Sequence, residues 1–227
     1  MDIHEMRVHE NSDQLWGGYT YAQTGDDLLI LNLFKNLGMN KFSYIDVGAH
    51  HPYNISNTAL MYERGCRGVN VEANPNLIEN FKTARPEDIN LNFGVAAKEG
   101  EMPFYMIDDW SGRNTFDRRS AEDFVKNNPQ FTIRKIMSIP VVRLEWIIQE
   151  YCKGIWPDFM SIDIESLDYE VLKSLDLKDN GPKIIDVEEK GEHVIKMMRE
   201  QGYEFCLNTG NAIYIRKECK EKAMLGH

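Results

Sequence analysis

Residues 42–50 read FSYIDVGAH, a short apolar run that ends abruptly in the triplet Asp46-Val47-Gly48. This pattern is typical of a buried strand that runs directly into a tight turn. Similar strand-like runs recur between helical segments, at RGVNVEANP (67–75), INLNFGVAA (89–97), DFMSIDIE (158–165) and KIIDVEE (183–189). Strands that alternate with helices predict an α/β fold, with a mostly parallel sheet covered by helices on both faces.

Helix and turn signals stand at the expected places around these runs. Thr24 and Asp27 form a capping-box pattern ahead of an apolar helical segment. Asn74 and Pro75 have the residue types preferred at the cap and first position of a helix. Residues 203–217 contain two strand-like runs joined by Asn-Thr-Gly-Asn, which predicts a terminal hairpin.

The length and composition indicate one globular unit. The chain has 227 residues, of which 42% are hydrophobic and 27% charged, enough for a sizeable core. We therefore expect a single domain over residues 1–227, with an N-terminal arm and helix over 1–40. Residues 108–135 break the alternation of strands and helices and are expected to form a variable insertion beside the site.

The charge and cysteine pattern limit the classes of partner. The net charge is −10, which argues against nucleic acid because phosphate contacts need a basic face. No run of about 18 apolar residues occurs, so no membrane partner is expected. The N-terminal MDIHEMRVHE lacks the apolar core of a signal peptide, and the four cysteines have no paired spacing. These features predict a reduced, cytoplasmic protein.

Acidic residues follow several of the predicted strands. Asp46, Glu72, the pair Asp163 and Glu165, and the dipeptide at 188–189 all stand at or just after a strand end. Ligands of parallel α/β sheets bind outside the carboxyl ends of the strands. The acids are therefore expected to gather around one ligand site.

The turn at Gly48 and the acid at Glu72 together indicate a nucleoside. A glycine at a strand-to-helix turn lets the backbone approach a ligand, although a lone glycine is also compatible with a simple tight turn. Glu72 lies 24 residues later, near the offset of about 20 at which an acid meets ribose hydroxyls. The alternative interpretation of Glu72 is a solvated carboxylate beside the start of a helix. Without the further glycines that cradle a pyrophosphate, the pair fits S-adenosylmethionine.

A resemblance to a known family rests on the same stretches. YIDVGAHHP, GVNVEANP, INLNFGVA, RNTF, DFMSIDIESLDYEVLKSLD and KIIDVE are similar in order and spacing to the motifs of FkbM-type methyltransferases, over roughly residues 20–217. The resemblance implies a class I methyltransferase (Rossmann-like) three-layer sandwich, whose seven-stranded sheet has an antiparallel last strand. It also implies S-adenosylmethionine-dependent O-methylation of a small or carbohydrate-like acceptor.

The resemblance also assigns residues to the cofactor. The turn from Asp46 to His50 would wrap the methionine part, Glu72 would hold the ribose, and residues 94–96 would lie near the adenine. Asp163 would face the methionine end and the reaction centre. The cofactor contacts implied in this way are Gln23, Asp27, Asp46, Gly48, Ala49, His50, Asn57, Glu72, Ala73, Gly94, Val95 and Asp163.

The catalytic candidates are Asp163, His51 and Glu188. A neutral imidazole could take a proton from an acceptor hydroxyl, although a loop histidine bonded to backbone is the alternative for His50 and His51.

A divalent metal is the second possibility at the same place. Asp163, Glu165, Glu188 and Glu189 could form an oxygen-rich magnesium or manganese site. We favour the alternative that Asp163 serves the cofactor while the other acids cap helices, so a metal is considered but not expected.

The insertion provides candidate residues for the acceptor. Residues 110–135 carry six basic against three acidic side chains, on a chain that is acidic elsewhere. Such a segment attracts anions, and arginine grips phosphate or carboxylate with two bonds. The acceptor-binding candidates are Arg113, Asn114, Arg118 and Arg119. The alternative is a solvated helix whose basic residues pair with neighbouring acids.

Two other functions remain open from the sequence. A nicotinamide-dependent oxidoreductase is compatible with Glu72, and the single-glycine turn argues against it. A non-catalytic protein could keep the same fold as an interaction module, and the acids at successive strand ends argue against that. The acceptor and the oligomeric state are not specified.

Overall fold

The computed structural model describes residues 12–15 and 18–225. Most of the predicted N-terminal arm, residues 1–11 and 16–17, lies outside the described residues. The rest of the arm forms a small hairpin of β1 (Asp13–Leu15) and β2 (Gly18–Thr20). None of the helices in the described part of the chain has the length and apolar character that crossing a bilayer requires.

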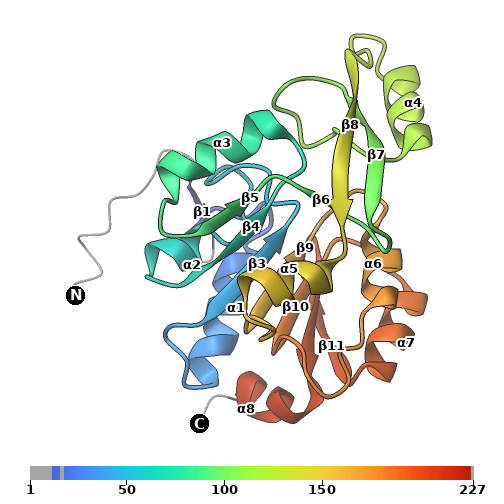
Figure 1. The fold of residues 1–227 in the computed structure, drawn as a ribbon. Coiled ribbons are helices and arrows are strands. Elements are labelled where there is room, and N and C mark those ends of the chain that lie inside the picture. Colours follow the sequence, from blue (N-terminus) through green and yellow to red (C-terminus); the bar gives the residue numbers. More distant parts are fainter. Residues whose placement is uncertain (1–11, 16–17, 226–227) are drawn as a thin grey trace.

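The main sheet has the strand order β11-β12-β10-β9-β3-β4-β5 (Figure 1). The five strands from β10 to β5 are parallel, whereas β12 pairs antiparallel with both β10 and β11. The strand bounds are β3 (Ser43–Val47), β4 (Arg67–Val71), β5 (Ile89–Leu91), β9 (Phe159–Ile162), β10 (Ile184–Val187), β11 (Tyr203–Asn208) and β12 (Ala212–Arg216). The predicted seven-stranded sheet with an antiparallel last strand is confirmed.

Helices cover both faces of this sheet. One face packs against α1, α2 and α8 through a core that includes Ile30, Phe34 and Met61. The other packs against α5, α6 and α7 through a core that includes Ile147 and Val171. The helix bounds are α1 (Asp26–Asn36), α2 (Ala59–Glu63), α3 (Pro75–Ala84), α5 (Leu144–Tyr151), α6 (Asp168–Ser174), α7 (Glu192–Glu200) and α8 (Lys220–Leu225), the last preceded by the short 3-10 helix η2 (Lys217–Cys219).

A second, smaller sheet flanks the predicted insertion, whose residues 108–135 form the connection between two of its strands and contain a helix. β6 (Gly94–Val95), β8 (Lys135–Val142) and β7 (Gly100–Met106) pair in that order, and α4 (Arg118–Asn127) lies between β7 and β8 in the chain. In Figure 1 this unit projects beyond the main sheet. The run 89–97, predicted as one strand, therefore divides between the two sheets.

The start of α1 differs from the prediction. Its N-cap is Gly25, and the predicted capping box is absent because the Thr24 hydroxyl donates to Asp26. Asp27 instead accepts hydrogen bonds from the Thr20 hydroxyl and the Tyr21 amide, at 2.5 and 2.9 Å. The acid therefore fastens the end of the hairpin to α1. At α3 the prediction holds, since the side chain of its cap residue accepts the amide of residue 76.

A row of polar side chains crosses the sheet on the face covered by α1 and α2. Asp46 on β3 stands in register with Asn70 on β4 and Ser161 on β9. Tyr44 belongs to the core under α1, and alternate residues of a strand share a face, so Asp46 points the same way. The strand ends thus bring polar groups together inside an otherwise apolar layer.

The turn after β3 is packed against the neighbouring strand. Gly48 has φ +84°, and a Cβ placed there would lie 1.8 Å from the carbonyl oxygen of Asp163. Only glycine fits this combination of left-handed backbone and close approach. Gly48 thus allows the Asp46 turn and the Asp163 strand end to border one space.

Candidate functional site

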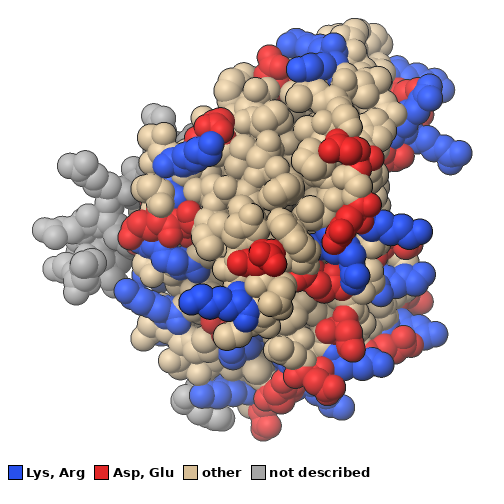
Figure 2. Space-filling model, in the orientation of Figure 1, with Lys and Arg blue, Asp and Glu red and all other residues tan. Residues whose placement is uncertain are grey.

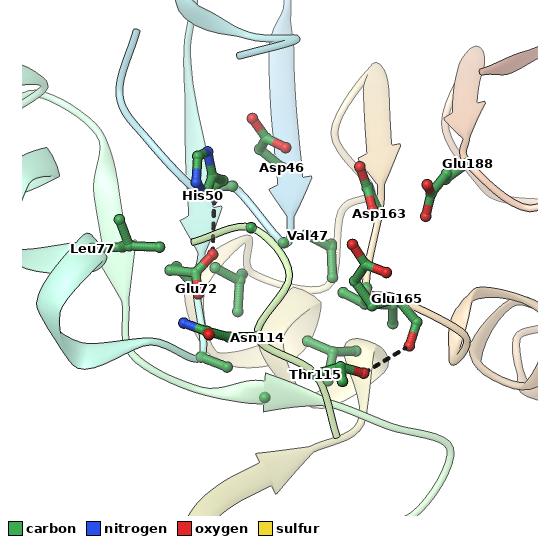
Figure 3. A pocket seen from close by; sticks show the side chains of 18 of the residues that line it. Asp46, Val47, His50, Glu72, Leu77, Asn114, Thr115, Asp163, Glu165 and Glu188 are labelled. Atoms are coloured by element: carbon green, nitrogen blue, oxygen red, sulfur yellow. Dashed lines mark hydrogen bonds between the residues drawn. The ribbon is translucent and has the colours of Figure 1, made fainter. Parts of the chain in front are cut away.

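A cavity of about 370 Å³ lies at the carboxyl ends of β3, β4, β9 and β10, within the range of roughly 300–1,000 Å³ typical of small-molecule sites. Figure 3 shows its lining from close by. Glu72 and His50 lie on one side, and Asp163, Glu165 and Glu188 gather on the other. The predicted clustering of strand-end acids is thus present in three dimensions.

Glu72 links the two turns that form one wall of the cavity. Its Oε2 accepts the His50 amide at 2.8 Å, and its Oε1 accepts the Asn74 amide at 2.7 Å. Burial raises the pKa of Glu72 to about 7, although the two amide bonds favour the charged form. Each oxygen keeps a second lone pair, so the carboxylate can accept two hydroxyl groups of a ligand.

Asp46 and Asn57 border the cavity from the α2 side. The Thr58 hydroxyl donates to Asp46 Oδ2 at 2.6 Å, and Asn57 Nδ2 donates to the Ser161 hydroxyl at 3.1 Å. Burial raises the pKa of Asp46, and the hydrogen bond from Thr58 opposes that rise. These bonds tie the loop between β3 and α2 to the polar row of the sheet.

One part of the cavity is apolar. Leu77, Phe93, Phe104 and Phe116 line it, and Gly94 adds no side chain. A Cβ at Gly94 would lie 2.5 Å from Phe116, so the slot is closed on that side by packed aromatic carbon. Such a slot suits a planar, uncharged ring next to the Glu72 carboxylate.

Asp163, Glu165 and Glu188 form an acidic triad at the other end. One carboxylate oxygen of each lies within 4.8 Å of the others. Burial, followed by the charge of Glu188, raises the pKa of Asp163, and the same two causes raise the pKa of Glu165 to about 7. Like charges this close favour retention of a proton between them.

The segment 108–116 closes over the cavity. Asn114 fixes it, because its side chain accepts the Ile107 amide and donates to the Asp108 carbonyl, both at 2.8 Å. The Thr115 hydroxyl reaches the Glu165 carbonyl at 3.5 Å (Figure 3). Arg113 lies exposed at the rim, with its guanidinium 5.3 Å from the ring centre of Phe124.

Left-handed backbone at non-glycine residues concentrates around this cavity. His50, Ile55 and Glu165 have φ values of 54°, 56° and 51°, and all three line it. Ser166, next to Glu165, has φ 79°. Such conformations cost of order 1–3 kcal/mol each and persist where surrounding contacts hold them, often at functional sites.

The structure brings most of the sequence-predicted residues into the cavity lining. Of the cofactor candidates, those that line it are Gln23, Asp46, Gly48, Ala49, His50, Asn57, Glu72, Ala73, Gly94, Val95 and Asp163. The catalytic candidate Glu188 and the acceptor candidates Arg113 and Asn114 also line it.

Four predicted residues lie elsewhere, each for a local reason. Asp27 is fully buried beneath the hairpin end. His51 turns back on its own loop, where Nδ1 accepts the amides of residues 53 and 54 at 3.1 and 2.8 Å. Arg118 pairs with Glu122 one helical turn later, and Arg119 follows it on the exposed start of α4.

The expected helix-capping role of the acids is also wrong. The N-cap residues of α6 and α7 are Leu167 and Gly191, and neither helix has a side-chain cap bond. Glu165 and Glu188 face the cavity instead. Glu189 lies 3.4 Å from the ring of His193.

Several lining residues were not predicted from the sequence. Ser161 is a polar residue inside a buried apolar strand, and this exception to the apolar pattern could have identified it as a lining residue. Leu77, Phe93 and Phe104 look like ordinary core residues in the sequence. Ile55 carries no sequence signal for its left-handed backbone.

Comparison with known proteins identifies a family. A family model described as the methyltransferase FkbM domain matches residues 46–205, more than half of the chain and a range that contains the acids of all four strand ends. No curated protein matches the sequence. Among solved structures, the chain is similar to a precorrin-6y C5,15-methyltransferase from Geobacter metallireducens GS-15, at 13% identity and a TM-score of 0.36, over 95% of this chain and 94% of that one.

The raised pKa of Glu72 predicts a pH-dependent stability. The folded pKa of about 7 lies above the ordinary 4.5, so the stabilisation is present below pH 4.5 and is lost as the pH rises through 7. Glu72 should thereby lower the free energy of unfolding by about 3 kcal/mol between these limits. Urea unfolding should give the free energies of unfolding of the wild type and Glu72→Gln across this range. Any advantage of the wild type at low pH should shrink or reverse as the pH rises. A constant difference would contradict the raised pKa.

Proposed function

The chain belongs to the FkbM methyltransferase family, and from that premise we propose that it transfers the methyl group of S-adenosylmethionine to a hydroxyl oxygen of a small, carbohydrate-like acceptor. The observation that carries this proposal is the buried carboxylate of Glu72, held by two amides beside an apolar slot. That arrangement suits a ribose next to a planar base. The family match favours methyl transfer over the nicotinamide-dependent alternative.

The lining fits such a cofactor along its whole length. Glu72 would accept the ribose hydroxyls, and the slot of Leu77, Phe93 and Phe104 would hold the adenine. The amides and side chains of the turn at 46–50, with Asn57, would hold the methionine part. When bound, the cofactor supplies an electrophilic methyl group on a positively charged sulfur, and the surrounding carboxylates suit that charge.

The acidic triad supplies a way to handle the acceptor proton. Carboxylate oxygens of Asp163 and Glu188 lie within 4.8 Å of each other, and burial and the charge of Glu188 raise the pKa of Asp163, which favours one proton held by the pair. A carboxylate oxygen of this pair can then accept the hydroxyl proton as the acceptor oxygen forms its new bond. Fixing the hydroxyl against these residues also supplies the alignment that methyl transfer needs.

The triad also has the chemistry of a divalent-metal site, since three carboxylates suit magnesium or manganese. We propose transfer without a metal, because the sharing of a proton accounts for the closeness of the acids. The chelator experiment below separates the two roles.

The acceptor is proposed to carry an anionic group. Arg113 lies on the cavity rim, and its charge partly opposes the rise in the pKa of Glu165 that burial and the charge of Glu188 cause. Figure 2 shows basic side chains on the projecting unit, among acidic and basic residues spread over the rest of this face. An arginine at the rim can hold a phosphate or carboxylate of the acceptor while its hydroxyl reaches the triad.

The role of Asp163 gives the first activity prediction. Asp163→Asn should lower methyl transfer from labelled S-adenosylmethionine about 100-fold, the scale of a lost general base, without unfolding the protein. Asp179→Asn, an exposed substitution of the same kind, is the control. Treatment with a chelator should leave wild-type activity unchanged. Complete loss that magnesium or manganese restores would instead make Asp163 a metal ligand, with Glu165 and Glu188.

The role of Arg113 gives the second activity prediction. The panel of acceptors comprises sugars, nucleotide sugars and phosphorylated metabolites. Arg113→Ala should lower kcat/KM for the anionic acceptors, by an amount that corresponds to about 1.5–3 kcal/mol of lost transition-state stabilisation. The affinity for S-adenosylmethionine should not change. Arg119→Ala, on the same segment but outside the cavity lining, should leave both quantities unchanged. Neutral acceptors that react as well as anionic ones, with an indifferent Arg113 variant, would refute the anionic acceptor.

A further inference from the structure

Arg85, at the C-terminal end of α3, is completely buried and has no carboxylate among its hydrogen-bond partners. Its two terminal nitrogens donate to neutral oxygens of Pro52, Ser56, Thr58 and Asn70, at 2.5, 2.7, 2.8 and 3.3 Å. Burying a guanidinium is costly, and an apolar side chain of similar volume is often equally stabilising in such a place. The position therefore calls for a role beyond core packing.

The partners of Arg85 concentrate on one loop. Three of its four acceptors lie in residues 52–58, which connect the Gly48 turn to α2. Two of them flank Ile55, whose left-handed φ of 56° is unfavourable for a β-branched residue. The guanidinium binds the loop before and after this residue. It thereby holds the strained conformation that turns Ile55 and Asn57 to the cavity.

Arg85 also fixes a hydroxyl that bonds to Asp46. The guanidinium donates to Thr58 Oγ1, so the single hydroxyl proton of Thr58 is directed to Asp46 Oδ2. The positive charge of Arg85 also favours the ionised form of Asp46. One buried side chain thus acts on both the shape of the loop and the charge of the cavity wall.

We propose that Arg85 is a positioning residue of the cofactor site, which it serves by holding loop 52–58 without contacting the ligand. The link to the cofactor rests on the proposed function, whereas the hold on the loop does not. Arg85 is absent from the cavity lining, and its effect passes through Thr58, Asn57 and Ile55.

The test compares two buried arginines. Arg85→Lys keeps the positive charge but replaces the two donating terminal nitrogens of the planar guanidinium with a single ammonium nitrogen. Arg216→Lys is the matched control, because Arg216 is also buried and donates to the carbonyls of 177, 178 and 181 near the opposite edge of the sheet. Hydrogen exchange of the ligand-free proteins should accelerate at least tenfold at residues 53–58 in Arg85→Lys, and stay at the wild-type rate there in Arg216→Lys.

Cofactor affinity is the second readout. Arg85→Lys should raise the Kd and the KM for S-adenosylmethionine at least tenfold while kcat at saturation changes little, and Arg216→Lys should change neither. If Arg85→Lys does not fold, Thr58→Val, which keeps the guanidinium and cuts its link to Asp46, should show the same rise in Kd.

The outcomes separate the two proposals. Wild-type exchange at 53–58 in Arg85→Lys would overturn the positioning role, and an unchanged Kd in that variant would overturn its link to the cofactor. If Arg85→Lys does not fold, an unchanged Kd in Thr58→Val would overturn the proposed effect of Arg85 through Thr58 and Asp46. A wild-type protein that binds no S-adenosylmethionine would refute the proposed function, while the exchange measurement would still decide whether Arg85 holds the loop.

Discussion

The carboxylate of Glu72 joins the two turns on which the rest of the cavity depends. It accepts the amide of His50 from the turn after β3 and the amide of Asn74 from the turn after β4. The two turns lie beside each other because β3 and β4 are adjacent and parallel, so their carboxyl ends meet at one edge of the sheet and a single side chain can reach both backbones. The bond to Asn74 lies at the start of α3, where a carboxylate is also favoured by the helix dipole. Removing this acid would loosen both walls at once.

The same sheet geometry explains the charge distribution in the cavity. Parallel strands end at one edge, so the acids at the carboxyl ends of β3, β4, β9 and β10 converge there although they are far apart in the sequence. Besides burial, the charge of Glu188 raises the pKa of its neighbours Asp163 and Glu165. A ligand that carries positive charge reduces this repulsion on binding. The arrangement therefore stores electrostatic free energy that such a ligand releases.

The sequence predicted the sheet and most of the cavity because both follow from strand periodicity. Asp46, Glu72, Asp163 and Glu188 were recognisable as acids at strand ends, whose position in a parallel sheet is determined by the fold. The separate sheet of β6, β7 and β8 was not predicted, because periodicity does not say which strands pair.

Errors arose where the direction of a side chain depends on loop or helix geometry. His51 follows His50 directly, yet its ring turns back on its own loop. Arg118 and Arg119 begin α4 and lie on its exposed side. Arg85, an arginine before a proline, gives no sign in the sequence that it is buried. Such positions are decided by tertiary contacts rather than by local pattern.

Calorimetric titration of S-adenosylmethionine into the wild type and Glu72→Ala tests the central claim most directly. The wild type should bind, and the variant should lose about 1.5–3 kcal/mol of binding free energy, since a charged hydrogen-bond acceptor for the ribose is removed. Circular dichroism establishes that the variant is folded. Binding of equal strength by a folded Glu72→Ala, or no binding by the wild type, would contradict the account.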